Sequence, residues 1–213
     1  MLRIYRARWS GVALALAVLS LSLVLLAGVL HLAGYDAERA LVALWRGSFG
    51  STNAFASATL VRATPLLLAG LGVALAFRAG IWNIGAEGQL LAGAVAATGL
   101  SVLLADVPRI LLVPLVLGAG TVAGTLWASI AEVLRRRRGV LEVISTIMLN
   151  FVALHLVGVL VHGPLQEPLG IYPQSAPIVD AARLPRIIPG TRLHAGFVIA
   201  LLVAPDALPQ ALR

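Results

Sequence analysis

The chain has 213 residues, of which 60% are hydrophobic and 12% are charged, and its mean hydropathy is +0.96. A typical soluble domain is about half apolar and a quarter charged, so this composition indicates an integral membrane protein. The chain has no cysteine, which excludes disulfides and thiolate chemistry. Its formal net charge is +7, and apart from histidine every basic residue is arginine. Arginine commonly flanks membrane spans, so this charge favours membrane topology over nucleic-acid binding.

The first apolar run, residues 11–33, follows an N-terminal segment that carries Arg3, Arg6 and Arg8. At about 23 residues, the run is long enough to cross a bilayer with some tilt. A cleaved signal peptide is the alternative, but the apolar core of such a peptide is only about 7–15 residues long. We therefore expect an uncleaved first span.

A polar stretch, residues 35–57, separates the first span from a second, which we expect at residues 58–77. The sequence then reads GIWNIGAEGQLLAGAVAA from Gly80 to Ala97, which places polar side chains and glycines between two apolar segments. A third span is expected at residues 84–104. The helix is therefore expected to be interrupted where the second span meets the third, a feature typical of transporters.

Two more complete spans are expected at residues 110–133 and 140–161, because both runs are apolar and of membrane-spanning length. Residues 162–192 contain several prolines and glycines and are expected to form an extramembrane loop. A sixth apolar run begins near Ala195 but meets Pro205 after about ten residues, half the length of a usual span. The sixth run is therefore only a partial span.

The expected fold is all-α: a polytopic integral membrane helix bundle of about five complete transmembrane helices plus a partial sixth, surrounded by membrane lipid. Basic residues in short loops set the orientation of such a bundle. Arg78 and the run Arg135–Arg138 fall on the same side as the N-terminal arginines. The N-terminus is therefore expected in the cytoplasm.

Three polar side chains, Asn83, Glu87 and Gln89, lie in the interrupted region. A carboxylate at the centre of a bilayer costs about 2.5–3.5 kcal/mol on insertion scales, so such groups usually face a bundle interior or a wet cavity. One interpretation is that these residues line a translocation path. The other is a broken-helix joint. If the helix begins near Asn83, this residue caps it and shares one face with Glu87 in the first turn.

A second polar pair, Thr146 and Asn150, is spaced i and i+4 on the fifth span. One interpretation is that the pair makes an interhelical hydrogen bond, and the other is that it lines the path. The interhelical bond is the simpler explanation of the two.

Small residues predict close contact between helices in lipid. Gly85, Gly88 and Gly93 give the third span a small surface, and Gly120 and Gly124 have GxxxG spacing on the fourth. Chance pairing in a glycine-rich chain is the alternative for the second motif. We expect the third span to pack closely against a neighbouring helix.

The sequence offers no candidate catalytic residue and no candidate metal ligands. It contains no G-x-x-x-x-G-K-[ST] motif and no H-E-x-x-H motif, and its four histidines are scattered along the chain. We therefore expect that the chain is not an enzyme and that it binds neither a cofactor nor a metal.

Two segments carry a family resemblance: FRAGIWNIGAEGQLLAGAVAA, and RRGVLEVISTIMLNFVALHLVGVLVHGPLQEP with the later PQSAPI and LPRIIPGTRLHAGF. They resemble permease subunits of ABC importers for ribose-type sugars, branched-chain amino acids and nucleosides, and the second resembles the nucleoside and simple-sugar branch. The resemblance implies a path for nucleosides or related small polar solutes across the bacterial inner membrane. It also implies three partners: a second permease in a heterodimer, a cytoplasmic ATPase that binds ATP, and an extracytoplasmic solute-binding lipoprotein.

The resemblance extends to about Leu202, whereas family members continue for further spans. It implies that residues 1–202 are the N-terminal part of a permease transmembrane domain and that residues 203–213 are an atypical tail, caused by truncation or a frameshift. One alternative is a truncated remnant that does not transport, and another is an importer of simple sugars or branched-chain amino acids. An ion-coupled carrier also suits polar residues in a broken helix, but the family motifs argue against it.

Overall fold

The computed structural model describes the backbone of residues 2–212 and the side chains of residues 13–204. Over the described backbone the chain is helical, with isolated β-bridges and no strand. The helices are α1 (Leu2–Leu32), α2 (Ala37–Phe49), α3 (Val61–Arg78), α4 (Ala86–Leu103), α5 (Arg109–Arg138), α6 (Glu142–Val161) and α7 (Gly196–Leu212), with a π-helical segment η1 (Ala54–Leu60) and a 3₁₀ turn η2 (Asp180–Ala182). The predicted all-α class is confirmed.

Among the described residues, five helical stretches are long and apolar enough to cross a membrane: Ala13–Leu32, Ala54–Arg78, Ala86–Leu103, Arg109–Arg138 and Glu142–Val161. At most 17% of the apolar window in each stretch is buried inside the structure, so large apolar side chains cover the outside of these helices. Exposing such a surface to water would be energetically unfavourable, whereas exposing it to the acyl chains of a bilayer is not. The five stretches match the five predicted spans, and the chain is a multi-pass membrane protein.

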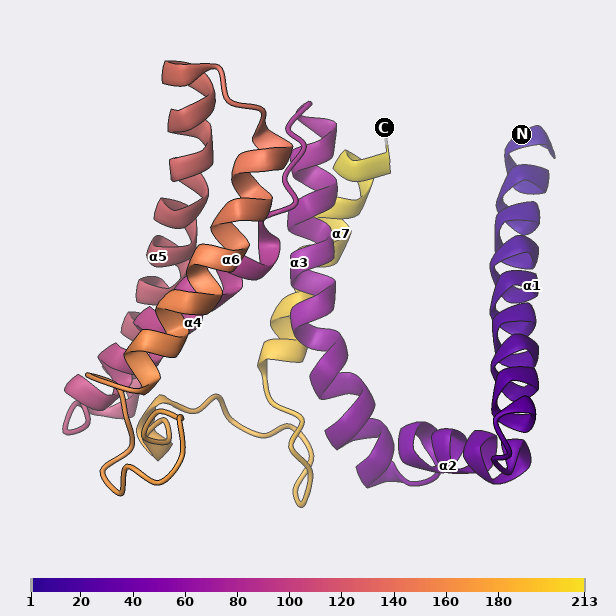
Figure 1. Cartoon of the computed structure of the whole chain (residues 1–213), viewed down its shortest axis with the longest axis horizontal. Coiled ribbons are helices and arrows are strands. Elements are labelled where there is room, and N and C mark those ends of the chain that lie inside the picture. The colour runs from indigo at the N-terminus through magenta and orange to yellow at the C-terminus, as the bar shows by residue number, and fades with distance from the viewer. Residues whose placement is uncertain (1, 213) are drawn as a thin grey trace. The chain divides into compact units, whose positions relative to one another are not determined.

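The chain divides into two compact units, Met1–Leu60 and Val61–Arg213. In the first unit, α2 turns away from the axis of α1 and runs across its end (Figure 1). Asp36 is the N-cap of α2, because its side chain accepts a hydrogen bond from the Arg39 N–H at 3.0 Å. The sequence indicated only a polar stretch here. The helix α2 and the early start of the second span, at Ala54, are therefore differences from the prediction.

In the second unit, α4 packs against both α5 and α6, and α7 packs along α3 (Figure 1). The backbones of α4 and α5 touch where two glycines face each other. A Cβ atom built on Gly93 would lie 2.9 Å from the carbonyl oxygen of Gly120, and one built on Gly124 would lie 3.2 Å from the carbonyl oxygen of Gln89. Small residues permit this approach, which dispersion forces stabilise in lipid.

The loop after α6 folds over the start of α5. Leu112 and Val116 of α5 are buried against Ala182 of η2. Arg109 donates a hydrogen bond from Nη2 to the carbonyl oxygen of Arg183 at 2.9 Å. These contacts cover the N-terminal end of α5. The polar site described below lies nearer the C-terminal end of this helix.

The apolar run near Ala195 forms α7, whose helical backbone continues to Leu212. The side chains of residues 205–213 lie outside the described part of the chain. The expectation that residues 203–213 are an atypical tail therefore stays a prediction.

Candidate functional site

The helical path is interrupted between α3 and α4, over residues 79–85 (Figure 1). Just beyond the end of α3, Gly80 has a φ of 75°, in the left-handed region. The Ile81 N–H donates to the Ala76 carbonyl at 2.9 Å, and the Gly80 N–H donates to the Phe77 carbonyl at 3.0 Å. This pattern is a Schellman cap, which favours glycine because glycine adopts positive φ without steric strain. The chain therefore breaks where the sequence predicted an interruption.

The next helix, α4, begins at Ala86, with Gly85 in the N-cap position and no side-chain cap of its own. Asn83 serves instead: its Oδ1 accepts from the Gly85 N–H at 2.8 Å and from Nε2 of Gln89 at 3.2 Å. Because α4 begins at Ala86, the condition that the helix begins near Asn83 is not met, and Asn83 does not share a helical face with Glu87. Asn83 stabilises the turn that leads into α4.

Three polar side chains of α6, Glu142, Thr146 and Asn150, are spaced i, i+4 and i+8 and lie on one face of the helix. We call them the α6 polar row. Glu142 Oε2 accepts a hydrogen bond from the Trp82 N–H at 3.1 Å. Thr146 Oγ1 accepts one from the Ile84 N–H at 3.3 Å. Backbone groups outside a helix need such partners within a membrane, because lipid offers none.

Asn150 completes the row with two hydrogen bonds from one amide. Its Nδ2 donates to the Ile84 carbonyl oxygen at 2.9 Å, and its Oδ1 accepts from the Gly88 N–H at 2.8 Å. In an uninterrupted helix, the Ile84 carbonyl and the Gly88 N–H would bond each other. The amide of α6 therefore bridges two backbone groups that the break has separated.

Two glycines leave room for the α6 polar row. A Cβ atom on Gly88 would lie 2.9 Å from Oδ1 of Asn150 and 3.0 Å from Nε1 of Trp127. A Cβ atom on Gly85 would lie 3.1 Å from Cβ of Thr146. Both positions are closer than ordinary van der Waals contact, so a larger residue would push α6 away from the break.

An ion pair fixes the first member of the row. Glu142 pairs with Arg135, which lies in the last turn of α5, while its other carboxylate oxygen accepts from the Trp82 N–H. The Glu142 side chain is only 10% exposed, and that of Arg135 is 48% exposed. Sequence reasoning placed Glu142 in the fifth span without assigning it to a site. Its regular spacing with Thr146 and Asn150 was the signal that could have found it.

Glu87 stands apart from these contacts. It lies in the first turn of α4, where the helix dipole favours a carboxylate. Its side chain is exposed and makes no hydrogen bond or ion pair within the part of the chain that the structure describes. It lines neither of the two polar cavities described next. Its place on a path stays a prediction.

Asn83 and Gln89 line two adjoining cavities of about 380 and 410 Å³, bounded by α3, α4, α5 and the start of α6. A row of hydroxyls on α5, from Thr121, Thr125 and Ser129, faces the same cavities with i, i+4 and i+8 spacing. Cavities of this size and mixed polarity suit a small polar solute. Sequence reasoning missed the hydroxyl row, because isolated Ser and Thr residues are common in apolar helices.

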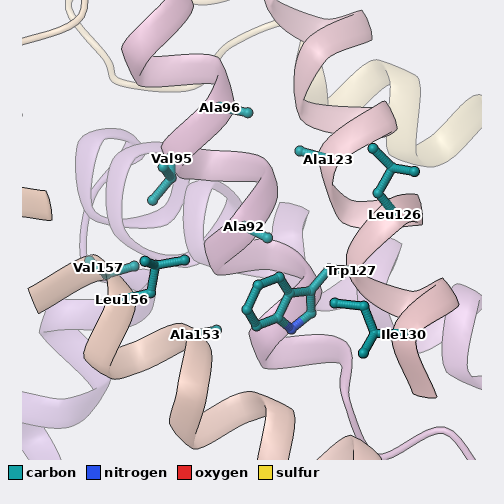
Figure 2. Close-up of a pocket in the computed structure, with 10 residues that line it drawn as sticks. All are labelled: Ala92, Val95, Ala96, Ala123, Leu126, Trp127, Ile130, Ala153, Leu156 and Val157. Carbon is teal, nitrogen blue, oxygen red and sulfur yellow. The ribbon is translucent and has the colours of Figure 1, made fainter. Parts of the chain in front are cut away.

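A third cavity, of about 490 Å³, lies between α4, α5 and α6 and is apolar (Figure 2). Figure 2 shows the indole of Trp127 among small and branched apolar side chains that include Ala92, Ala96 and Ala153. Nε1 of Trp127 is buried and has no hydrogen-bond partner among the described residues. This cavity offers almost no polar surface, so the two cavities beside Asn83 are the better candidate path.

Residues 55–204 match the family model described as branched-chain amino acid transport system / permease component. The chain belongs to this permease family. It is 45% identical over 152 residues to the glucose ABC transporter permease protein TsgB13 of Haloferax volcanii, 38% over 179 residues to the guanosine ABC transporter permease protein NupP of Bacillus subtilis, and 35% over 144 residues to the nucleoside ABC transporter permease protein NupB of Lactococcus lactis. No solved structure matches the chain.

In the same order, the three alignments cover 67%, 83% and 67% of this chain. They cover only 40% of TsgB13, 51% of NupP and 39% of NupB. The chain therefore spans about half the length, or less, of the curated relatives that it matches. The family resemblance carried by the two sequence segments is confirmed. The matched region contains both the break before α4 and the whole α6 polar row.

Proposed function

We propose that the chain forms part of the translocation path of an ATP-driven importer for nucleosides or related small polar solutes. The observation that carries this proposal is the break before α4, where Asn83 and Gln89 line two adjoining polar cavities. Transporters commonly place their paths beside interrupted helices, because irregular backbone is tolerated in a membrane where it lines a cavity. The names of the curated relatives, for guanosine, nucleosides and glucose, support a small polar cargo.

The proposed importer has three further components: a second permease subunit in a heterodimer, a cytoplasmic ATPase and an extracytoplasmic solute-binding lipoprotein. ATP is bound and hydrolysed by the ATPase, so this chain binds no cofactor and catalyses no reaction. Support for this division comes from the permease family model and from relatives named as ABC transporter permeases.

The proposed location is the cytoplasmic (inner) membrane, with the N-terminus in the cytoplasm. If the five spans alternate in direction, Arg78, the break and the run Arg135–Arg138 fall on one side, which the positive-inside rule assigns to the cytoplasm. The bonds of Glu142 to Arg135 and to the Trp82 N–H support a common side for these segments. Alkaline phosphatase fused after Arg138 is then inactive and one fused in the loop after α6 is active. The reverse pattern contradicts this orientation.

Solute uptake tests the proposed substrate class. The chain is expressed with its partner subunits in a host that lacks nucleoside, glucose and leucine importers, and uptake of each labelled solute is measured. The proposal expects guanosine uptake that other nucleosides inhibit. Uptake of leucine alone contradicts it and supports the branched-chain amino acid alternative, and uptake of glucose alone supports the sugar alternative.

The chain spans about half the length, or less, of its curated relatives, so the uptake assay needs two versions of it. One is the chain itself, and the other is the chain joined to the remaining half of NupP. Uptake by both versions supports transport by the chain with its partners. Uptake by the joined version alone supports the alternative that the chain is a non-transporting remnant.

A further inference from the structure

The helix α2 presents two neighbouring surfaces of different chemistry. Arg39 and Arg46 lie on one side of the helix, and Val42, Trp45 and Phe49 form an apolar row beside them. Val42 is 40% exposed, Trp45 63% and Phe49 51%, and α2 has no buried residue. An exposed apolar row next to basic side chains is typical of helices that lie in a membrane interface.

The connections of α2 hold it at the membrane surface. Residues 33–36 join it to the candidate span that ends at Leu32, and residues 50–53 join it to the span that begins at Ala54. Links of this length reach at most about 14 Å. Because α2 also runs across the end of α1 (Figure 1), its length of about 20 Å extends along the bilayer surface.

Aromatic contacts link α2 to the start of the second candidate span. The ring centroids of Trp45 and Phe49 are 5.0 Å apart, and those of Phe49 and Phe55 are 5.8 Å apart. Phe55 lies in the first turn of the second candidate span, so these contacts place the apolar row beside the start of that span. Thr59 Oγ1 also donates to the Ser48 carbonyl at 2.8 Å, which fixes η1 against α2.

One basic side chain of α2 is free to bind a ligand. Asp36, Glu38, Arg39 and Arg46 line a shallow groove along the helix. Asp36 pairs with Arg39 at 2.9 Å, whereas the Arg46 guanidinium makes no hydrogen bond or ion pair within the described residues. A planar guanidinium matches the geometry of a phosphate group.

We propose that α2 is a membrane-surface helix that binds phospholipid. Val42, Trp45 and Phe49 enter the boundary between headgroups and acyl chains, and Arg46 binds the phosphate of a lipid headgroup. The bilayer is the occupant of this surface, rather than another protein, because both ends of α2 are held where spans enter the membrane. The role of this surface is to anchor the link between the first two spans, and it does not depend on the transported solute.

Spin labelling tests the apolar row, since the chain has no native cysteine. Val42→Cys and Phe49→Cys each place one label on the row, and Ala43→Cys places a matched control label on the arginine side. The full chain is reconstituted in vesicles of phosphatidylethanolamine and phosphatidylglycerol. Collision rates with oxygen, which concentrates in lipid, and with a water-soluble nickel complex are then measured by EPR.

The proposal expects more collisions with oxygen at positions 42 and 49, and more with nickel at position 43. Equal nickel accessibility at all three positions places the row in water and overturns the proposal. Labels at 42 and 49 that are closed to both reagents show that protein covers the row, which also overturns it.

A second pair of variants tests Arg46 directly. Native mass spectrometry counts the phosphatidylglycerol molecules retained by the wild-type chain, Arg46→Lys and Arg46→Gln. Arg46→Gln is expected to retain this lipid about five-fold less strongly, corresponding to about 1 kcal/mol per cation at an anionic surface. Arg46→Lys is expected to fall between wild type and Arg46→Gln, because lysine keeps the charge but not the planar guanidinium. Equal retention by all three, or displacement of the lipid by inorganic phosphate, contradicts binding of a lipid phosphate.

Discussion

The side-chain amide of Asn150 takes the place of a helical hydrogen bond, with its Nδ2 2.9 Å from the carbonyl oxygen of Ile84. The same amide accepts from the Gly88 N–H, the group that would bond Ile84 in a continuous helix. A side chain of α6 thus completes the backbone of another segment. This contact allows α4 to begin beside polar cavities without leaving peptide groups unpaired in an apolar environment.

Replacing Asn150 by leucine leaves the Ile84 carbonyl and the Gly88 N–H without their partner. We expect a loss of about 1–3 kcal/mol in the free energy of unfolding, because the desolvation of these groups is no longer offset. His155→Leu is the matched control on α6, because the described hydrogen bond of His155 is to its own helix. The free energy is measured by unfolding in mixed detergent micelles. A cost of Asn150→Leu no greater than that of the control contradicts a bridging role.

Adding one methyl group at Gly88 separates α6 from the break. In Gly88→Ala, the new Cβ lies 2.9 Å from Asn150 Oδ1 and 3.0 Å from Trp127 Nε1, so overpacking is expected to cost about 1–3 kcal/mol. Gly118→Ala is the control, because nothing lies within 4 Å of a Cβ there and alanine favours the helix. Melting temperatures of the two variants are compared. The account expects a lower value for Gly88→Ala alone, and equal values argue against close packing.

The charge of Glu142 and its role as an acceptor are separable. Glu142→Gln keeps an acceptor for the Trp82 N–H but loses the ion pair with Arg135, whereas Glu142→Leu loses both. We expect the glutamine variant to be the more stable of the two, by about 1 kcal/mol. A double-mutant cycle of Glu142→Gln with Arg135→Gln is expected to give a coupling energy of about 0.5–1 kcal/mol. Strict additivity would show that the pair contributes nothing to stability.

The membrane helices could be predicted from the sequence, because apolar runs of about 20 residues are long enough to cross a bilayer. The helix α2 was missed because its two arginines and the acidic residues Asp36 and Glu38 lower its hydropathy, although its apolar side chains recur with helical spacing. The start of α4 at Ala86, not Asn83, depends on side chains of α6. Contacts between residues about 60 positions apart, such as Trp82 with Glu142, leave no local pattern in a single sequence.

Gln89 and Glu87, two positions apart on α4, differ in their relation to the proposed path. Gln89 lines both polar cavities, whereas Glu87 is exposed and lines neither. In the assembled importer we expect Gln89→Leu to reduce guanosine uptake at least about ten-fold, because one of the few polar groups that can pair with the solute is lost. Glu87→Gln is expected to keep uptake within about two-fold of wild type, since surface changes cost little stability. Membrane levels of both variants are measured alongside uptake. The opposite ranking would move the path to Glu87.

Residue-resolved hydrogen exchange of the chain in lipid nanodiscs tests the central claim most directly. The account predicts that the Gly88 amide exchanges slowly in the wild type and at least about ten-fold faster in Asn150→Leu, because its acceptor on α6 is gone. It also predicts that Thr146→Val speeds exchange at the Ile84 amide, while exchange at Gly88 changes less. If neither amide changes its exchange rate in these variants, the side chains of the α6 polar row do not bond the backbone groups at the break, and the account is contradicted.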